Sequence, residues 1–563
     1  MTMTWDEAAT AVTGPGGPFE LVDGDVNGVP TKLYAACPNS LRDLFGIAAL
    51  HGDKPYLVYE DEPWSYAELM AQISSVAHAL VHDLGVSKGD RVAIAMRNYP
   101  EWIVAFAATT SVGAIAVALN AWWVTDELQY GLDDSGASVV VVDAERLERL
   151  KPIRDQMAAK IVAVRTPAAD LPAGVLAYDD MAATGQPMPE VVIGPDDDAT
   201  ILYTSGTTGF PKGAVSSHRA VLSALLGFAT RGAITGAIEA AETGEAPVPP
   251  ENPAIILCVP LFHVTGLVPV MMGTFVSGSR LVMMHRWDPE RALELIERER
   301  VTQFVGVPTM SWELLESPDF EMRDTSSLIS VGGGGAPAPP ELVRRIEDEI
   351  ATARPGIGYG MTETNALGPQ NAGDDYVKRP TSAGRAVPSM EVRVVDPEGN
   401  PVPTGERGEI CFKGANLIRG YWNKPEATAE TIRNGWLHSG DIGWLDEDGF
   451  IYVADRIKDM VLRGGENIYC AEVEAVIYEH PAVYEAAVFG VPHERLGEEV
   501  AAAVMTKPGE SVGVAELQAF IGERLAKFKV PTHVRIVNEQ LPRNASGKIL
   551  KREIRDQMSA ELT

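Results

Sequence analysis

The sequence predicts an α/β protein with a large N-terminal domain and a small C-terminal one. Two observations carry this prediction. Short apolar runs alternate with helical stretches through the first 350 residues, and the pattern changes to short β-rich pieces after about residue 384. Near-continuous apolar strands separated by helices are typical of sheets that helices cover on both faces. We therefore expect two α/β layers in the N-terminal part of this 563-residue chain.

The clearest predicted strands of these layers are residues 91–95, 138–142, 254–259 and 303–307. The segment 102–125 carries no charged residue, so its length alone would allow it to cross a bilayer. Polar residues such as Asn120 interrupt it, and the apolar run 114–119 is more typical of a buried strand. We prefer a buried helix followed by a buried strand and keep a membrane span as the alternative.

The β-rich region 384–452 contains strands such as 391–395 and 408–412 between Gly, Pro, Asn and Asp residues. This texture predicts a small β-barrel or sheet subdomain. After residues 455–459 the pattern is again mixed α and β, and about 100 residues remain, enough for a small α+β domain. We predict a hinge near Lys458, between an N-terminal domain, 1–457, and a small C-terminal domain, 458–563.

The composition excludes several classes of function. The chain has 47 basic and 78 acidic residues, a net charge of −31, which disfavours nucleic acid and anionic membranes as partners. Cys37, Cys258, Cys411 and Cys470 lack the spacing of a zinc site or a disulfide framework, which fits a reducing cytoplasm. The first residues have neither the basic start nor the apolar run of a secretory signal.

A hydroxyl- and glycine-rich loop is the most informative segment for function. It follows a predicted strand at 199–203, precedes an apolar helix at 220–226, and contains Thr204, Ser205, Gly206, Thr207, Thr208, Gly209 and Lys212. Glycines let backbone N–H groups approach phosphate oxygens, hydroxyls add donors, and a lysine adds positive charge. The order of residues excludes the standard P-loop. The loop predicts a polyphosphate site, with a flexible surface turn as the alternative.

Two further segments share this chemistry. Residues 331–337 offer a bare backbone for a ring or an acyl chain, and residues 359–363 combine an aromatic face, a hydroxyl and a carboxylate. Between the loop and these segments, residues 230–252 are predicted to be a surface excursion or lid.

Five segments together, 203–213, 359–363, 439–441, 455–459 and 541–548, resemble the ordered motifs of the adenylate-forming superfamily. That superfamily comprises acyl-CoA synthetases, peptide-synthetase adenylation domains and beetle luciferase. The resemblance spans nearly the whole chain and is greatest to bacterial fatty-acid–CoA ligases. It implies a reaction in which a carboxylate attacks the α-phosphate of ATP, and a thiol then displaces AMP.

The resemblance also implies a role for each motif. The loop residues from Thr204 to Gly209, with Lys212, would hold the β- and γ-phosphates. Tyr359, within the Tyr359-Gly360-Met361 run, would pack on adenine beside Gly335, Ala336 and Pro337. Thr362 would bond the α-phosphate, Glu363 would hold Mg²⁺, and Asp441 would accept from the ribose hydroxyls beside Arg456.

Lys548 is the main catalytic candidate, because an ammonium stabilises the negative charge that accumulates at phosphorus. The resemblance implies that the C-terminal domain rotates at Lys458 and that Gly464 and Gly465 then leave room for the pantetheine of coenzyme A. It places His263 near the carboxylate and thiol entrance, although a core histidine is an equal alternative. Asn544 departs from the threonine that many relatives carry.

The sequence also bears on the acid and on the acceptor of the acyl group. We expect an apolar acyl pocket formed around Val264, Gly332, Gly333 and Gly334, with a fatty acid as the substrate or a bulkier ring acid as the alternative. The chain ends 15 residues after Lys548, without a carrier domain, which favours free CoA. The competing readings are an acyl-AMP ligase that loads a carrier protein, a luciferase-like oxygenase, and a non-catalytic nucleotide- or acyl-binding protein. For the oligomeric state, a homodimer is kept as one alternative.

Overall fold

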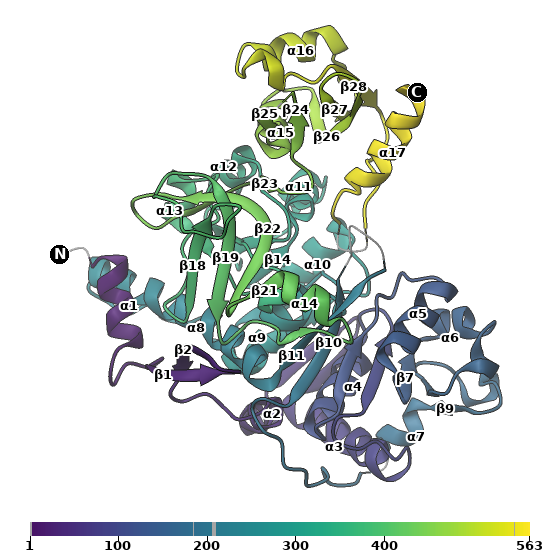
Figure 1. Ribbon diagram of the computed structural model, residues 1–563. Helices are drawn as coiled ribbons and strands as arrows, with labels where there is room; N and C mark the ends of the chain where they lie inside the picture. The colour runs from purple at the N-terminus through teal and green to yellow at the C-terminus, as the bar shows by residue number, and fades with distance from the viewer. Residues whose placement is uncertain (1–2, 184, 205–209, 465, 545–546, 563) are drawn as a thin grey trace.

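The computed structural model describes the chain except for residues 1–2, 184, 205–209, 465, 545–546 and 563. It is a mixed α/β protein with a large N-terminal domain and a small C-terminal domain that stands on it (Figure 1). In chain order the α-helices are α1 Trp5–Thr13, α2 Leu41–Ala48, α3 Tyr66–His82, α4 Pro100–Ser111, α5 Thr125–Ser135, α6 Ala144–Leu150, α7 Tyr178–Ala182, α8 His218–Thr243, α9 Gly273–Ser277, α10 Pro289–Glu299, α11 Pro308–Glu316, α12 Pro340–Glu349, α13 Gly373–Lys378, α14 Pro425–Thr431, α15 Cys470–Tyr478, α16 Val514–Gly522 and α17 Lys551–Leu562.

The first large sheet has eight strands in the order β20-β11-β10-β6-β5-β7-β8-β9. Their bounds are β5 Arg91–Ala95, β6 Ile115–Ala118, β7 Val139–Val142, β8 Lys160–Ala163, β9 Val175–Ala177, β10 Asp198–Thr204, β11 Lys212–Ser217 and β20 Gly420–Tyr421. The pairs from β10 through β6, β5, β7 and β8 to β9 are parallel, whereas β11 returns antiparallel to β10. Parallel pairing follows from the helices that separate these strands in sequence.

The second large sheet also has eight strands, in the order β17-β16-β15-β14-β12-β13-β3-β4. Their bounds are β3 Pro55–Tyr59, β4 Glu62–Ser65, β12 Ala254–Leu257, β13 Arg280–Met283, β14 Gln303–Gly306, β15 Ser330–Gly334, β16 Arg354–Gly358 and β17 Gln370–Ala372. Together with the first sheet it confirms the two predicted α/β layers. One large hydrophobic cluster joins residues of both sheets with α3 and α4.

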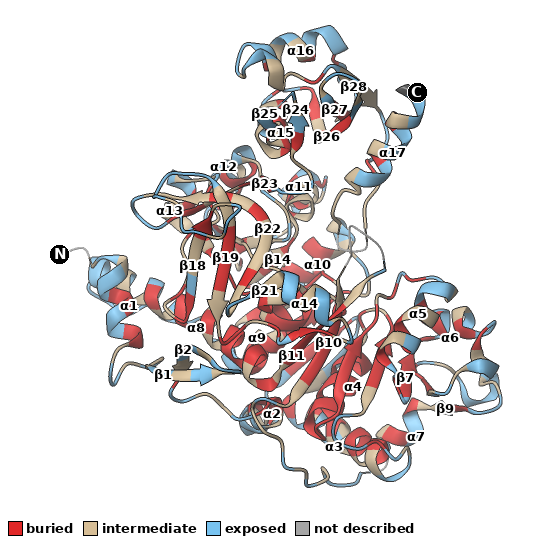
Figure 2. Ribbon diagram, viewed as in Figure 1, coloured by how far each residue is buried: buried red, intermediate tan, exposed pale blue. Residues whose placement is uncertain are grey.

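The charge-free segment 102–125 lies inside the protein. Every residue of α4 is buried, as are all four residues of β6, so α4 appears red throughout in Figure 2. The membrane alternative for this segment is therefore wrong. Among the described residues, one other helix, α8, has the length and apolarity of a membrane span, and its N-terminal half packs into the core. Buried helices of globular proteins share that composition.

The predicted excursion at 230–252 needs correction, because α8 continues as a helix to Thr243 and only the residues after it form a loop. The added turns are apolar on one side, and they pack against α1 through a cluster that includes Ala8, Val12 and Ile234. Arg231 lies over the ring of Trp5 at 4.5 Å from its centroid. The N-terminal segment, which also forms the hairpin of β1 Leu21–Val26 and β2 Val29–Tyr34, thus covers the end of α8 (Figure 1).

The β-rich region forms an open antiparallel sheet of five strands rather than a closed barrel. Its order is β18-β19-β22-β21, with β23 paired to β22. The bounds are β18 Met390–Val395, β19 Gly408–Gly414, β21 Ile432–Arg433, β22 Trp436–Leu445 and β23 Ile451–Arg456. The strand β23 ends just before Lys458 and leads into the small domain.

The small domain contains a five-stranded sheet, order β25-β24-β27-β26 with β28 paired to β27, and the helices α15, α16 and α17. Its strands are β24 Val461–Arg463, β25 Glu466–Ile468, β26 Val483–His493, β27 Gly497–Thr506 and β28 His533–Val537. Two clusters of buried apolar residues on either face of β26 and β27 form its core. A domain with its own core can move as a unit.

Candidate active site

The predicted phosphate loop is flanked by β10 and β11, which pair antiparallel. The register pairs Thr204 with Lys212 and Tyr203 with Gly213, and the Thr204 hydroxyl donates to the Lys212 carbonyl at 3.4 Å. The predicted ligands Ser205, Gly206, Thr207, Thr208 and Gly209 lie outside the described residues. Next to Lys212, the Tyr130 hydroxyl donates to the Pro211 carbonyl at 2.9 Å.

Tyr421 connects this hairpin to the segment that contains Glu363. The Lys212 Nζ lies 4.9 Å from the centroid of the Tyr421 ring, and the Tyr421 hydroxyl donates to Glu363 Oε1 at 2.7 Å. The lysine and the carboxylate therefore meet on one tyrosine. The sequence analysis missed Tyr421, and its only signal was the Gly-Tyr-Trp-Asn run that begins at Gly420.

The segment from Tyr359 to Glu363 leaves the C-terminal end of β16. Asn365 and Ala366, which follow it, have φ angles of 53° and 65°, an uncommon backbone for residues other than glycine. The buried Asn365 side chain accepts from the Ser216 hydroxyl at 3.0 Å and donates to the Asn416 carbonyl at 2.9 Å. These two hydrogen bonds stabilise the unfavourable backbone conformation of Asn365 and Ala366, and they thereby hold the preceding residues Thr362 and Glu363 in position.

The glycines of β15 are required by close strand packing. A Cβ at Gly333 would lie 1.7 Å from the Gly306 carbonyl oxygen. A Cβ at Gly332 or Gly334 would also collide with the backbone of β16, at 2.6 and 2.5 Å from its carbonyl oxygens. The parallel register pairs Gly334 with Gly358. Gly335, Ala336 and Pro337 follow Gly334 along the chain, and Tyr359 follows Gly358, so the two segments predicted to bind adenine leave adjacent strands at the same end.

Tyr359 and Arg456 converge on Asp441. The Tyr359 hydroxyl donates to Asp441 Oδ2 at 2.5 Å, and Arg456 Nε lies 3.4 Å from Asp441 Oδ1. Burial raises the pKa of the Asp441 carboxyl, and the Arg456 guanidinium opposes that effect. Burial also raises the pKa of the Tyr359 hydroxyl, which therefore stays protonated and remains a donor.

Lys548 of the small domain lies close enough to Asp441 and Arg456 for their charges to affect its pKa. Its pKa is lowered to about 8 by burial and then by the Arg456 guanidinium, while the Asp441 carboxylate acts in the opposite direction. The backbone N–H of Lys548 donates to Asn544 Oδ1 at 2.9 Å, so the asparagine supplies the local bond that the departure from threonine had put in doubt. Arg543 closes the loop by donating to the Gly547 carbonyl and to Glu485 Oε1, each at 2.5 Å.

His263 lies beside Lys548. Burial and the nearby Lys548 charge lower the pKa of His263 to about 4, so the imidazole is neutral near pH 7. Its Nδ1 accepts from the Thr265 backbone N–H at 3.4 Å, which satisfies one ring nitrogen locally. Val264 is buried next to it, just before the π-helix η4 Gly266–Met272. A π-helix often marks a functional site.

A cavity of about 310 Å³ separates the two domains on this side of the site. The large domain contributes Arg97, Trp122 and Arg286 to its wall, and the small domain contributes Arg543 and Asn544. Phe262, the neighbour of His263, also lines it. The cavity is basic, and part of it would close or open if the small domain moved.

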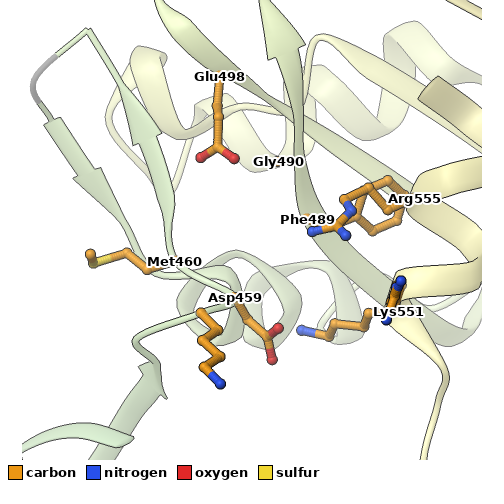
Figure 3. Close-up of a pocket in the computed structure, with 9 residues that line it drawn as sticks. Asp459, Met460, Phe489, Gly490, Glu498, Lys551 and Arg555 are labelled. Atoms are coloured by element: carbon orange, nitrogen blue, oxygen red, sulfur yellow. The ribbon is translucent and has the colours of Figure 1, made fainter. Parts of the chain in front are cut away.

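The hinge prediction falls on a small ionic pocket. Lys458, Asp459 and Lys551 line it, and Figure 3 shows the Lys551 and Asp459 side chains pointing toward one another. Lys551 Nζ also pairs with Glu474 Oε1 at 2.7 Å. Gly464 lies in the turn between β24 and β25 and donates its N–H to the Leu496 carbonyl at 2.8 Å, so its contact is within the small domain. Gly465 lies outside the described residues.

The chain matches two family models. Residues 45–422 match the AMP-binding enzyme family, and residues 472–548 match the AMP-binding enzyme C-terminal domain. A feruloyl-CoA synthase of Amycolatopsis sp. is 39% identical over 87% of this chain and 93% of its own length. A long-chain-fatty-acid–CoA ligase of Mycobacterium tuberculosis is 35% identical over 89% and 94%, respectively.

A solved structure agrees with these sequence relatives. The o-succinylbenzoate CoA synthetase of Bacillus subtilis, in complex with its acyl-adenylate intermediate, has 31% identity and a TM-score of 0.76 over 91% of this chain and 97% of its own. The match covers both domains. This chain therefore belongs to the AMP-binding enzyme family of adenylate-forming enzymes and is an AMP-forming acid–thiol ligase.

Proposed function

We propose that this enzyme uses ATP to convert an apolar carboxylic acid, with a fatty acid as the leading candidate, into an acyl-adenylate, and then transfers the acyl group to coenzyme A. The observation that carries the proposal is the convergence of Lys548, Asp441, Arg456 and His263 from segments far apart in sequence. An ammonium beside a carboxylate acceptor and a tyrosine face suits a nucleotide whose α-phosphate is attacked.

In the first step the substrate carboxylate attacks the α-phosphorus and pyrophosphate leaves. Lys548 would stabilise the charge that develops at the phosphoryl oxygens, and Thr362 would add a hydroxyl donor. Asp441 accepts from the ribose hydroxyls, Arg456 assists it, and Tyr359 packs on adenine beside Gly335, Ala336 and Pro337. Thr204 and Lys212 hold the outer phosphates together with the loop between them.

Glu363 is the residue that fits Mg²⁺. Its carboxylate is a hard oxygen donor, and the Tyr421 hydroxyl fixes one of its oxygens at 2.7 Å, close to the Lys212 side of the site. When bound, the ion would neutralise phosphate charge and orient the oxygens for displacement.

The second step would use a rotation of the C-terminal domain, 458–563, against the N-terminal domain, 1–457, about Lys458. The arrangement described above has Lys548 in the site, which suits adenylate formation. Rotation would withdraw Lys548 and bring Gly464 and Gly465 toward the acyl-adenylate. The basic cavity beside Phe262 would supply the path for the thiol, because coenzyme A carries phosphates that arginines attract.

The acid is apolar in this proposal because Val264 and the strands around Gly332, Gly333 and Gly334 present no charged partner for a polar substrate end. The relative named for long-chain fatty acids supports a fatty acid. The relative named for the feruloyl group, which is aromatic, supports a ring acid as the second candidate.

The test is a half-reaction assay with ATP, Mg²⁺ and a panel of fatty and aromatic acids, with and without CoA, in which products are identified by mass. Acyl-CoA from a fatty acid is expected, and Lys548→Gln is the matched inactive control. Acyl-adenylate without acyl-CoA would redirect the proposal to a carrier-protein acceptor. Preference for aromatic acids would favour the second candidate, and no product with any acid would favour a nucleotide- or acyl-binding protein.

A further inference from the structure

Asp441 lies in an irregular part of its strand. The antiparallel register between β19 and β22 passes from Glu409 opposite Ile442 to Cys411 opposite His438. One residue of β19 therefore faces three of β22, which are Ser439, Gly440 and Asp441. A bulge of this kind re-aims the side chain that follows it, and Gly440 adopts the φ of +73° that it needs. The direction of the Asp441 side chain thus depends on the bulge.

The bulge is held by bonds from both strands. The Ser439 hydroxyl donates to the Ile410 carbonyl at 2.6 Å and accepts from the Asp441 N–H at 3.0 Å. The Gly440 carbonyl accepts from the Ile457 N–H at 2.8 Å, next to the proposed hinge residue. Another backbone donor of the bulge, the Gly440 N–H, bonds to Glu409 Oε1 at 3.0 Å.

Glu409 also binds the residue at the start of the bulge. Its second oxygen, Oε2, lies 2.7 Å from His438 Nδ1, and the His438 side chain is only 7% exposed. One carboxylate therefore bridges the two residues that flank Ser439. Because the Glu409 side chain is only 19% exposed, little solvent competes for these bonds.

The adjacent residue Cys411 suggests two alternative functions for the Glu409–His438 pair, namely activation of a nucleophilic cysteine and binding of a metal ion. Cys411 Sγ lies 3.4 Å from His438 Nδ1, the same nitrogen that bonds Glu409. A catalytic triad needs the two ring nitrogens for the two partners, so a nucleophilic cysteine does not fit. Burial raises the pKa of the Cys411 thiol to about 12, which also opposes a reactive thiolate.

A metal ion is the second reading, since one ligand atom from each of Glu409, Cys411 and His438 lies within 4.8 Å of the others. Both Glu409 oxygens already accept hydrogen bonds, however. The guanidinium groups of Arg393 and Arg433 are close enough to favour the Cys411 thiolate, so their positive charge would oppose a cation. The cluster fits a hydrogen-bonded brace better than a metal centre.

We propose that Glu409 is a positioning residue that sets ribose recognition: its carboxylate fixes the 439–441 bulge and so holds Asp441 toward the nucleotide. This inference rests on the proposed function, because it takes Asp441 as the acceptor of the ribose hydroxyls. In Figure 1 the strands β18, β19 and β22 lie side by side, which places Glu409 on the strand adjacent to the bulge.

The test is calorimetric binding of ATP and of 3′-deoxy-ATP to the full chain in the absence of any acid. We expect the wild type to prefer ATP by roughly tenfold or more, because a buried carboxylate would lose its hydroxyl partner with the deoxynucleotide. Glu409→Ala should reduce this preference to about twofold while 3′-deoxy-ATP binds almost as before. Glu409→Gln keeps an acceptor for the Gly440 N–H and should retain most of the preference.

The matched control is Glu391→Gln, on the neighbouring strand β18, where Glu391 pairs with Lys413 at 3.0 Å and is half-exposed. This variant should bind like the wild type. If Glu409→Ala does not fold, His438→Ala, which removes the partner of Oε2, should lower the same preference at least threefold.

Equal weakening of both nucleotides, or a full ATP preference in Glu409→Ala, would overturn the role of Glu409 and leave the proposed function standing. A wild type that does not distinguish the two nucleotides would overturn the ribose role of Asp441 and with it this inference. No binding of ATP at all would overturn the proposed function itself.

Discussion

The lowered pKa of Lys548 predicts how the rate of adenylation depends on pH. With a pKa of about 8 in the free enzyme, nearly all Lys548 side chains are charged at pH 7 and about a tenth are charged at pH 9. If the ammonium form is the active one, kcat/KM for pyrophosphate release should fall about tenfold for each pH unit above 8. The value of kcat/KM falls as the pH rises, because deprotonation removes the positive charge of Lys548.

Two neighbours of Lys548, Tyr359 and His263, do not titrate in this window. Burial raises the pKa of Tyr359, and burial with the Lys548 charge lowers that of His263 to about 4. The triphosphate of bound ATP should raise the pKa of Lys548, since a nearby negative charge favours the ammonium. The fall in kcat should therefore begin at a higher pH than the fall in kcat/KM.

The assay is pyrophosphate release between pH 6 and 10 with ATP and acid below saturation. Lys548→Arg keeps a permanent charge and should be slower but lose the fall at high pH, whereas Lys548→Gln should lose about 10²- to 10³-fold at every pH. A wild-type profile without the fall near pH 8, or the same fall in Lys548→Arg, would refute the assignment.

Three further predictions concern the loop, the hinge and the sheet. Arg543→Ala removes the hydrogen bonds to Gly547 and Glu485 and should slow adenylation by about tenfold or more. When acyl-adenylate is added to this variant, it should still react with CoA. An unchanged rate of acyl-adenylate formation would contradict the role of Arg543. Lys458→Pro should spare adenylation and slow thioester formation, because proline restricts the angle that rotation changes; equal loss of both half-reactions would count against the hinge. Gly333→Ala should lower the free energy of unfolding by about 2 kcal/mol or more, because its Cβ would collide with the Gly306 carbonyl. Gly232→Ala, on the exposed face of α8, should instead raise the free energy of unfolding by about 0.5 to 1 kcal/mol. Thermal denaturation compares the two variants, and similar melting temperatures would contradict the packing argument.

Local patterns were sufficient to predict the layers of the fold. The runs at 91–95 and 303–307 coincide with β5 and β14 within a residue, because buried parallel strands have to be apolar along their whole length. The end of α8 was missed for a related reason. Residues 230–243 have alanine, isoleucine and glutamate that suit a helix, but only the cover provided by α1 makes their apolar side a buried one.

The sequence by itself determined the α/β layers, the order of the motifs typical of the family and the candidate residues within them, because each depends on residue type and local spacing. The tertiary structure decided which of these residues meet. It brought Lys548 to Asp441 across the domain boundary, placed Glu363 against Tyr421, and assigned Glu409 to the bulge. These contacts join segments separated by up to about a hundred residues, and no local pattern encodes such pairings, since they depend on strand register and domain docking.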